Sequence, residues 1–138
     1  MSDRVLNILL VEDDEVDVMN VRRAFERNNV SNPLYVAGNG LEALEMLRDG
    51  TVPTERRLIL LDLNMPKMNG IEFLQALRAD PELASAPVVV LTTSNDDQDK
   101  IDAYNLNVAG YLLKPVTFSS FCERMTTLNK YWMLVEMP

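Results

Sequence analysis

The chain has 138 residues, a length that suits one domain, and 47% of them are hydrophobic, which is enough for a substantial core. Its formal net charge of −8 disfavours direct binding of a polyanion such as nucleic acid. The absence of histidine excludes Ser-His-Asp catalysis and histidine-based zinc sites, and the single cysteine, Cys122, excludes an internal disulfide. No apolar stretch reaches about 18 residues and no signal region opens the sequence, so we expect a cytoplasmic protein without a membrane span.

The first part of the chain alternates apolar runs with amphipathic segments. Ile8–Val11 is too short for a helix and too continuous for a half-exposed strand, so we predict a strand buried on both faces. Asp17–Asn28 follows with apolar residues at helical spacing, and a weaker run, Leu34–Ala37, is a candidate second strand. Leu41–Leu47 marks a second helix, which Gly50 is expected to stop.

The second part continues this alternation after an irregular loop, Thr51–Arg57, whose Arg56 and Arg57 we interpret as solvated side chains. Three further buried strands are predicted at Leu58–Leu61, Val88–Leu91 and Tyr111–Leu113. Three further helices are predicted at residues 69–77, which Asn69 and Gly70 open, at 96–106 and at 117–132. Strict alternation predicts a doubly wound α/β fold with five parallel strands, five helices covering both faces, and a single domain over residues 1–138.

Polar residues directly follow each of the four strong strands. They are Glu12, Asp13 and Asp14 after the first, Asp62 after the second, Thr92, Thr93 and Ser94 after the third, and Lys114 and Pro115 after the fourth. The carboxyl ends of parallel strands share one edge of a sheet, and neighbouring strands are only about 4.8 Å apart. We therefore expect these groups to meet at the edge where such folds bind ligands.

Several carboxylates crowded at one edge repel one another, and a hard divalent cation with oxygen ligands relieves that repulsion. Asp13 and Asp62 are candidates to supply carboxylates to Mg²⁺ or Mn²⁺, and Glu12 is a candidate to act through water. The backbone carbonyl of Asn64 is a further candidate ligand. Lys114 supplies a positive point charge of the kind that suits a phosphoryl group.

Asp62 is also a candidate nucleophile, because an aspartate carboxylate can form an acyl phosphate and phosphoryl transfer needs mainly positioning and charge neutralisation. The hydroxyl of Thr92 is then available to hydrogen-bond the arriving group. Taken singly, each piece has a simpler interpretation: the acids as a helix cap, Asp62 as a turn residue, Lys114 as a surface lysine and Tyr111 as an edge residue. Their occurrence together at successive strand ends favours the functional interpretation.

This set of residues resembles the receiver domains of two-component response regulators over nearly the whole chain. The resemblance rests on Glu12-Asp13, on the run Leu58–Pro66 around Asp62, on Asn69-Gly70, on Thr92 and on Lys114-Pro115, with their spacing. It implies a flavodoxin-like fold with strand order 2-1-3-4-5. It also implies a signalling domain that accepts a phosphoryl group from a sensor histidine kinase and catalyses only its own phosphorylation and dephosphorylation.

The resemblance assigns a role to each site residue. Asp62 is the phosphorylation site; Glu12, Asp13, Asp62 and the Asn64 carbonyl hold Mg²⁺ or Mn²⁺; Thr92 and Lys114 contact the phosphoryl group. Tyr111 moves inward together with Thr92 as a switch, and the Lys114-Pro115 bond is cis. Two positions depart from the commonest pattern, since Thr93 stands where alanine is usual and Glu12 where aspartate is common, and these leave the lifetime of the phosphorylated state open.

Within the family, the runs Val88–Ser94 and Asn129–Leu134 look like those of stand-alone regulators paired with phytochrome kinases of bacteria and cyanobacteria. We therefore expect a sensor histidine kinase as the partner, with a bacteriophytochrome as the candidate, and neither nucleic acid nor membrane as a partner. Because the chain has no histidine, the phosphohistidine must belong to that partner.

The C-terminal tail, residues 129–138, is richer in apolar side chains than covering one short helix requires. We expect a homodimer formed through the fifth helix and this tail, whereas the alternative is that Trp132 packs back on its own domain. Because no DNA-binding or enzymatic segment is apparent after the domain, we expect output through protein contacts or onward phosphoryl transfer.

Three other functions fit these residues less well. A phosphatase with an aspartyl nucleophile commonly needs a second acid two residues on, where this chain has Asn64. A flavodoxin-like binder of flavin phosphate is disfavoured because Glu12, Asp13 and Asp14 would repel the phosphate. A degenerate scaffold is disfavoured because Asp62 and Lys114 are both present, together with Thr92.

Overall fold

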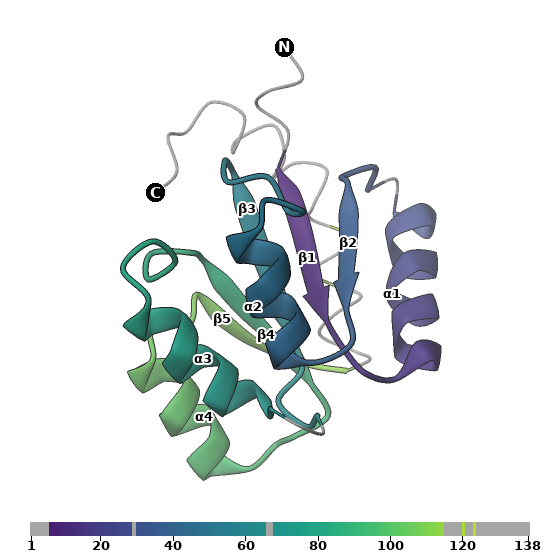
Figure 1. Cartoon of the computed structure of the whole chain (residues 1–138). Helices are drawn as coiled ribbons and strands as arrows, with labels where there is room; N and C mark the ends of the chain where they lie inside the picture. The colour runs from purple at the N-terminus through teal and green to yellow at the C-terminus, as the bar shows by residue number, and fades with distance from the viewer. Residues whose placement is uncertain (1–5, 29, 66–67, 115–119, 121–122, 124–138) are drawn as a thin grey trace.

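The computed structural model describes residues 6–28, 30–65 and 68–114, together with Ser120 and Glu123 (Figure 1). The predicted fifth helix, apart from those two residues, lies outside the described residues, as do Pro115, Cys122 and the tail 129–138. In the described part of the chain, no helix combines the length and the apolar character that crossing a membrane requires.

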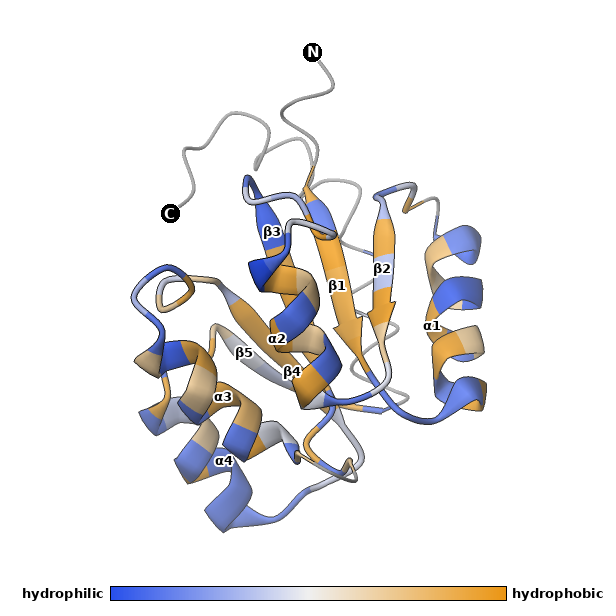
Figure 2. Cartoon of the chain, in the orientation of Figure 1, coloured by the Kyte–Doolittle hydropathy of each residue, from blue (hydrophilic) through white to orange (hydrophobic). Residues whose placement is uncertain are grey.

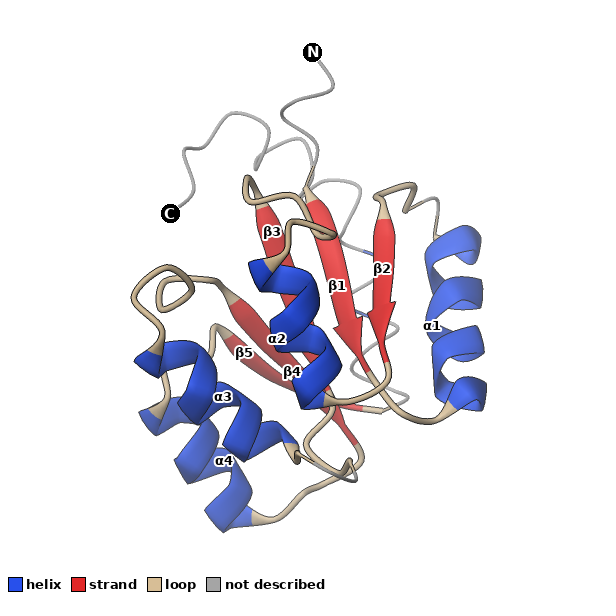
Figure 3. Ribbon diagram, viewed as in Figure 1, coloured by secondary structure: helices blue, strands red, loops and turns tan. Residues whose placement is uncertain are grey.

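Five parallel strands form one sheet, and four helices connect them within the described residues (Figure 3). The elements in chain order are β1 Asn7–Val11, α1 Glu15–Arg27, β2 Leu34–Ala37, α2 Gly40–Arg48, β3 Arg57–Leu61, α3 Gly70–Ala79, β4 Val88–Thr92, α4 Asp97–Asn105 and β5 Gly110–Leu113. The strand order is β2-β1-β3-β4-β5, which confirms the predicted order and the doubly wound fold. Each predicted strand and each of the first four predicted helices is present, with ends displaced by a few residues.

Capping side chains fix where the helices begin. Asp14 accepts hydrogen bonds from the backbone N–H groups of Val16 and Asp17, so α1 begins at Glu15 rather than at the predicted Asp17. Asn69 and Glu72 form a reciprocal capping box at the start of α3. The simpler interpretation of the acidic run as a helix cap is therefore correct for Asp14.

Alternate residues of the strands point to opposite faces of the sheet and build two separate cores. On one face, Leu9, Ile59 and Val90 belong to a cluster that also contains residues of α2, α3 and α4, including Phe73. On the other face, a second cluster joins the remaining strand positions to Val21 and Phe25 of α1 and to their neighbours. In the hydropathy-coloured ribbon, β1 and β4 are accordingly mostly orange, whereas the helices alternate between orange and blue along their length (Figure 2).

The sequence prediction of full burial is wrong for the last strand. All four residues of β5 are partly exposed, whereas β3 and β4 are buried along their whole length. The reason is position: β5 lies at one edge of the sheet and pairs with β4 alone among the described strands. Tyr111 therefore lies at an edge that remains partly open.

The prediction of solvated arginines is also wrong. Arg56 and Arg57 are each 8% exposed. Arg56 adopts a left-handed φ of 48°, and its carbonyl accepts a 2.7 Å hydrogen bond from the backbone N–H of Asn7. Because that bond ties the end of the loop to β1, the chain enters β3 at Arg57 inside the sheet rather than at the surface.

Candidate functional site

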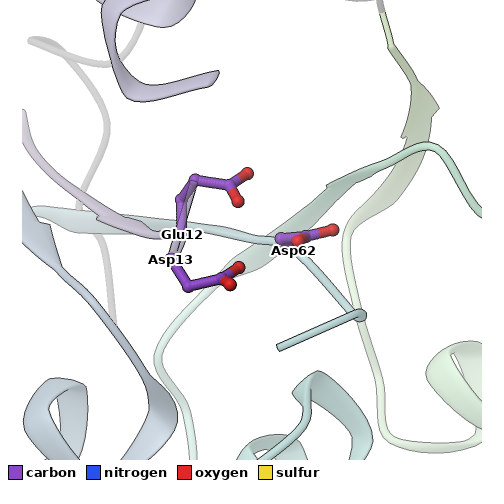
Figure 4. Close-up of side chains that lie close together, drawn as sticks. All are labelled: Glu12, Asp13 and Asp62. Atoms are coloured by element: carbon purple, nitrogen blue, oxygen red, sulfur yellow. The ribbon is translucent and has the colours of Figure 1, made fainter. Parts of the chain in front are cut away.

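Three carboxylates meet at the carboxyl edge of the sheet. Glu12 and Asp13 follow β1 directly, and Asp62 follows the neighbouring strand β3. The two strands are paired in register up to Val11 and Leu61, and the backbone N–H of Asp62 donates a 3.1 Å hydrogen bond to the Val11 carbonyl. One ligand oxygen from each acid lies within 4.8 Å of the others, and the three side chains project toward a shared space (Figure 4).

The residues of this cluster fit a hard divalent cation. Glu12 and Asp62 are only 2% and 6% exposed, so their charges are largely withdrawn from water, while Asp13 remains exposed on the solvent side. Two buried carboxylates beside each other are costly without a counter-charge, and Mg²⁺ or Mn²⁺ prefers oxygen ligands of this kind. Asn64 lies two residues past Asp62 with an exposed side chain, and the ligand role of its backbone carbonyl stays a prediction.

Lys114 supplies the positive charge at this edge. It follows β5 directly, and its backbone N–H donates a 3.1 Å hydrogen bond to the Thr92 carbonyl. Its Nζ donates to Glu12 Oε1 at 2.5 Å and to Asp17 Oδ2 at 3.0 Å. Within the described residues no ion pair joins Lys114 to Asp62, whose charge acts on the lysine from a greater distance.

Asp17 is a site residue that the sequence analysis missed, because it was assigned only to the start of a helix. Its carboxylate is brought to Lys114 by the first turn of α1, 97 positions away in sequence. A usable signal was its spacing, since Asp17 lies about one helical turn past the N-cap Asp14 and only five residues past Glu12.

Burial and charge displace the titration of this group of residues. Burial raises the pKa of Glu12 to about 7; the hydrogen bond from Lys114 offsets part of that effect, and the nearby charge of Asp62 adds to it. Burial opposes the charge on Lys114, but its hydrogen bonds to Glu12 and Asp17 outweigh this and raise the pKa of the ammonium group. Lys114 therefore stays charged at neutral pH.

Thr92 lies at the end of β4 and is completely buried. Its hydroxyl oxygen accepts a 3.2 Å hydrogen bond from the backbone N–H of Ser94. The carbonyl of Ser94 in turn accepts a 2.9 Å hydrogen bond from the Tyr111 hydroxyl, and Ser94 Oγ donates to Asp99 on α4 at 2.7 Å. One residue, Ser94, thus connects the two predicted switch residues and the first turn of α4.

Gly70 allows α3 to begin directly against the loop that carries Asp62. A Cβ placed at Gly70 would lie 2.6 Å from Leu63 Cα and 2.7 Å from the Asp62 carbonyl oxygen, far inside van der Waals contact. In the Asn69-Gly70 pair noted in the sequence, Asn69 therefore caps the helix, and Gly70 lets the helix backbone lie so close to the Asp62 loop that no side chain fits between them.

Residues 8–126 match the family model described as the response regulator receiver domain. Among curated proteins, the chain is 38% identical to a probable methanogenesis regulatory protein, FilR2, of Methanothrix harundinacea over 91% of this chain and 83% of that protein. It is 36% identical to the response regulator Rcp1 of Synechocystis over 91% of this chain and 88% of that protein, and a crystal structure of Rcp1 in an Mn²⁺-bound form superimposes with a TM-score of 0.74.

A solved structure agrees over an even larger share of the chain. The phosphorylated cyanobacterial phytochrome response regulator RcpA superimposes with a TM-score of 0.78 and 32% identity, covering 97% of this chain and 99% of that chain. The matched region contains all the strand-end residues described above. The chain therefore belongs to the family of response regulator receiver domains.

Proposed function

We propose that Asp62 accepts a phosphoryl group from a phosphohistidine of a sensor histidine kinase. A carboxylate oxygen of Asp62 attacks phosphorus, a P–O bond forms, the P–N bond to the partner's imidazole breaks, and its electron pair stays on that nitrogen. Because the chain has no histidine, the donor must be supplied in trans. The observation that carries the proposal is the meeting of Glu12, Asp13 and Asp62 within 4.8 Å at one sheet edge.

In this proposal Glu12, Asp13 and Asp62, with the backbone carbonyl of Asn64, hold Mg²⁺ or Mn²⁺. The cation would supply charge neutralisation for the phosphoryl oxygens and for the crowded acids. Lys114, which contacts Glu12, offers a second positive charge, and the Thr92 hydroxyl offers a hydrogen bond. Asp62 itself is buried directly after β3, and the hydrogen bond from its backbone N–H to the Val11 carbonyl fixes its backbone beside β1.

The same proposal assigns the switch to Thr92 and Tyr111. A phosphoryl group adds about two negative charges and three acceptor oxygens, which compete for the Thr92 hydroxyl. If Thr92 moves toward that group, its hydrogen bond from Ser94 changes, and Ser94 also holds the Tyr111 hydroxyl and Asp99. A change at Asp62 would therefore reach the face formed by β5 and α4 through one intervening residue.

The likeness to the phytochrome response regulator RcpA supports a bacteriophytochrome-type kinase as the partner. We further propose a homodimer that uses the fifth helix and residues 129–138, which the apolar composition of that segment supports. The net charge of −8 supports signalling through protein contacts rather than through nucleic acid.

Incubation with acetyl phosphate and Mg²⁺, followed by intact-mass measurement, tests the proposed acceptor. We expect a mass gain of one phosphoryl group in the wild-type protein, which is lost when the metal is chelated and absent in Asp62→Asn. Asp97→Asn, a change of the same kind on the exposed first turn of α4, is the matched control and is expected to behave as the wild type. A mass gain that survives Asp62→Asn would place the acceptor elsewhere.

A further inference from the structure

Lys114 is held between two acids that come from different elements. Glu12 stands at the end of β1 and Asp17 in the first turn of α1, and the Lys114 Nζ donates to both, at 2.5 and 3.0 Å. The lysine side chain is 12% exposed and that of Asp17 is 30% exposed, so neither ion pair is fully screened by water.

Glu12 and Asp17 differ in whether they also belong to the candidate cation site. Glu12 belongs to the cluster that fits a cation, whereas Asp17 does not. An ammonium group has three donors, and here two of them are engaged by carboxylates. A phosphoryl group on Asp62 would present three strong acceptor oxygens and about two negative charges, so it competes with these carboxylates for the same ammonium group.

Local structure fixes Asp17 in this position. Asp14 caps α1 by accepting from the backbone N–H groups of Val16 and Asp17, which sets the direction of the first turn. That turn carries the Asp17 carboxylate to Lys114, whereas Glu15 in the same turn is exposed and makes no ion pair with the site within the described residues. The contact with Lys114 is thus built by the helix cap.

We propose that Asp17 is a positioning residue that restrains Lys114 away from Asp62 before phosphoryl transfer and thereby slows phosphorylation. This inference rests on the proposed function, since it concerns how Asp17, which lies outside the cation cluster, limits the contact of Lys114 with a phosphoryl group on Asp62. Removing the charge of Asp17 frees one donor of Lys114 without removing a candidate metal ligand.

The test compares Asp17→Asn with Glu15→Gln, which removes an equal charge from the same helical turn. The initial rate of phosphorylation by acetyl phosphate is measured by intact mass across a range of Mg²⁺ concentrations. We expect Asp17→Asn to raise the rate at saturating Mg²⁺ by about two- to fivefold, the range that one partly exposed ion pair is worth. Glu15→Gln is expected to match the wild type, and the Mg²⁺ concentration giving half the maximal rate is expected to stay unchanged in both.

A second comparison asks whether the effect passes through the lysine. In a Lys114→Gln background, Asp17→Asn is expected to have no further effect on the rate, because the restrained group is gone. Asp17→Asn at or below the wild-type rate, a change confined to the Mg²⁺ dependence, or an acceleration that persists without Lys114 would each overturn the inference. A wild-type protein that gains no phosphoryl group on Asp62 would instead overturn the proposed function.

Discussion

Among single residues, Glu12 is the most deeply buried acid of the cluster. It is 2% exposed, pairs with Lys114 and lies within reach of Asp13 and Asp62. Its raised pKa means that the folded protein binds a proton at Glu12 more tightly than the unfolded chain does. The stability contributed by that proton is fully present below the pKa of Glu12 in the unfolded chain. It is lost as the pH rises through the higher pKa of Glu12 in the folded protein.

Replacing Glu12 is therefore expected to change how stability depends on pH. In the absence of metal, the free energy of unfolding of the wild-type protein should fall as the pH rises from 4.5 to about 7. The total fall, measured relative to the Glu12→Gln protein over the same pH range, should be about 1–3 kcal/mol. Urea unfolding in the presence of a chelator, at a series of pH values, measures the difference. Asp49 and Asp80 have lowered pKa values and so act only at pH values below this window. Parallel pH profiles for the two proteins would show that Glu12 titrates normally.

At the scale of elements, strand ends and helix starts together make the site. The register of β1 with β3 places Glu12, Asp13 and Asp62, while the start of α3 packs against the chain just after Asp62 through Gly70. Asp62, the candidate acceptor, is thus positioned by strand β3, which precedes it, and by the first residue of α3, which packs against its backbone.

Gly70→Ala is expected to disturb that support. The new Cβ would overlap the Asp62 carbonyl and the Leu63 backbone, so either α3 or the acceptor loop must shift, at a cost of about 1–3 kcal/mol in unfolding free energy. We also expect slower phosphorylation of Asp62, because its carboxylate is displaced relative to Lys114 and the other acids.

Gly38→Ala is the matched control, since the nearest atom to a Cβ there is 3.9 Å away and the site is not touched. Both variants would be compared by urea unfolding and by the acetyl phosphate assay. Equal behaviour of the two would mean that the approach of α3 to Asp62 is not needed.

The elements themselves were predictable from the sequence, and the contacts between them only in part. Buried parallel strands leave continuous apolar runs, so β1, β3 and β4 could be located, and the polar residues after them could be assigned to one edge. The pairing of Lys114 with Asp17 could not be predicted, because it depends on which side of α1 faces the end of β5 in the folded chain.

Burial of the loop before β3 could not be predicted either, whereas the edge position of β5 follows from the predicted strand order 2-1-3-4-5. The burial of Arg56 and Arg57 depends on a left-handed turn that returns the backbone to β1, and charged residues in a loop give no sign of it. The partial exposure of β5 depends on edge position, which the apolar run Tyr111–Leu113 does not encode.

At the scale of the whole molecule, the remaining prediction concerns association. We expect two copies of the chain to form a homodimer whose interface consists of the fifth helix and the apolar residues of segment 129–138. Trp132 is the largest side chain in that segment. Sedimentation equilibrium of the wild-type protein should give the mass of two chains, and Trp132→Ala should shift the mass toward that of one chain. Leu41→Ala, on the exposed surface of α2, is the control and should leave the mass unchanged. A Trp132→Ala protein that sediments as the wild type does would show that this side chain is not at an interface.

The ion pairs of Lys114 join the first strand and the first helix of the fold to the end of its last strand. Its partners Glu12 and Asp17 precede it by 102 and 97 positions, and β1 and β5 are separated in the sheet by two other strands. During translation, a nascent chain would therefore expose its acidic residues long before the ribosome releases the lysine that neutralises them. Any activity that depends on this lysine therefore requires that all five strands of the sheet have been synthesised.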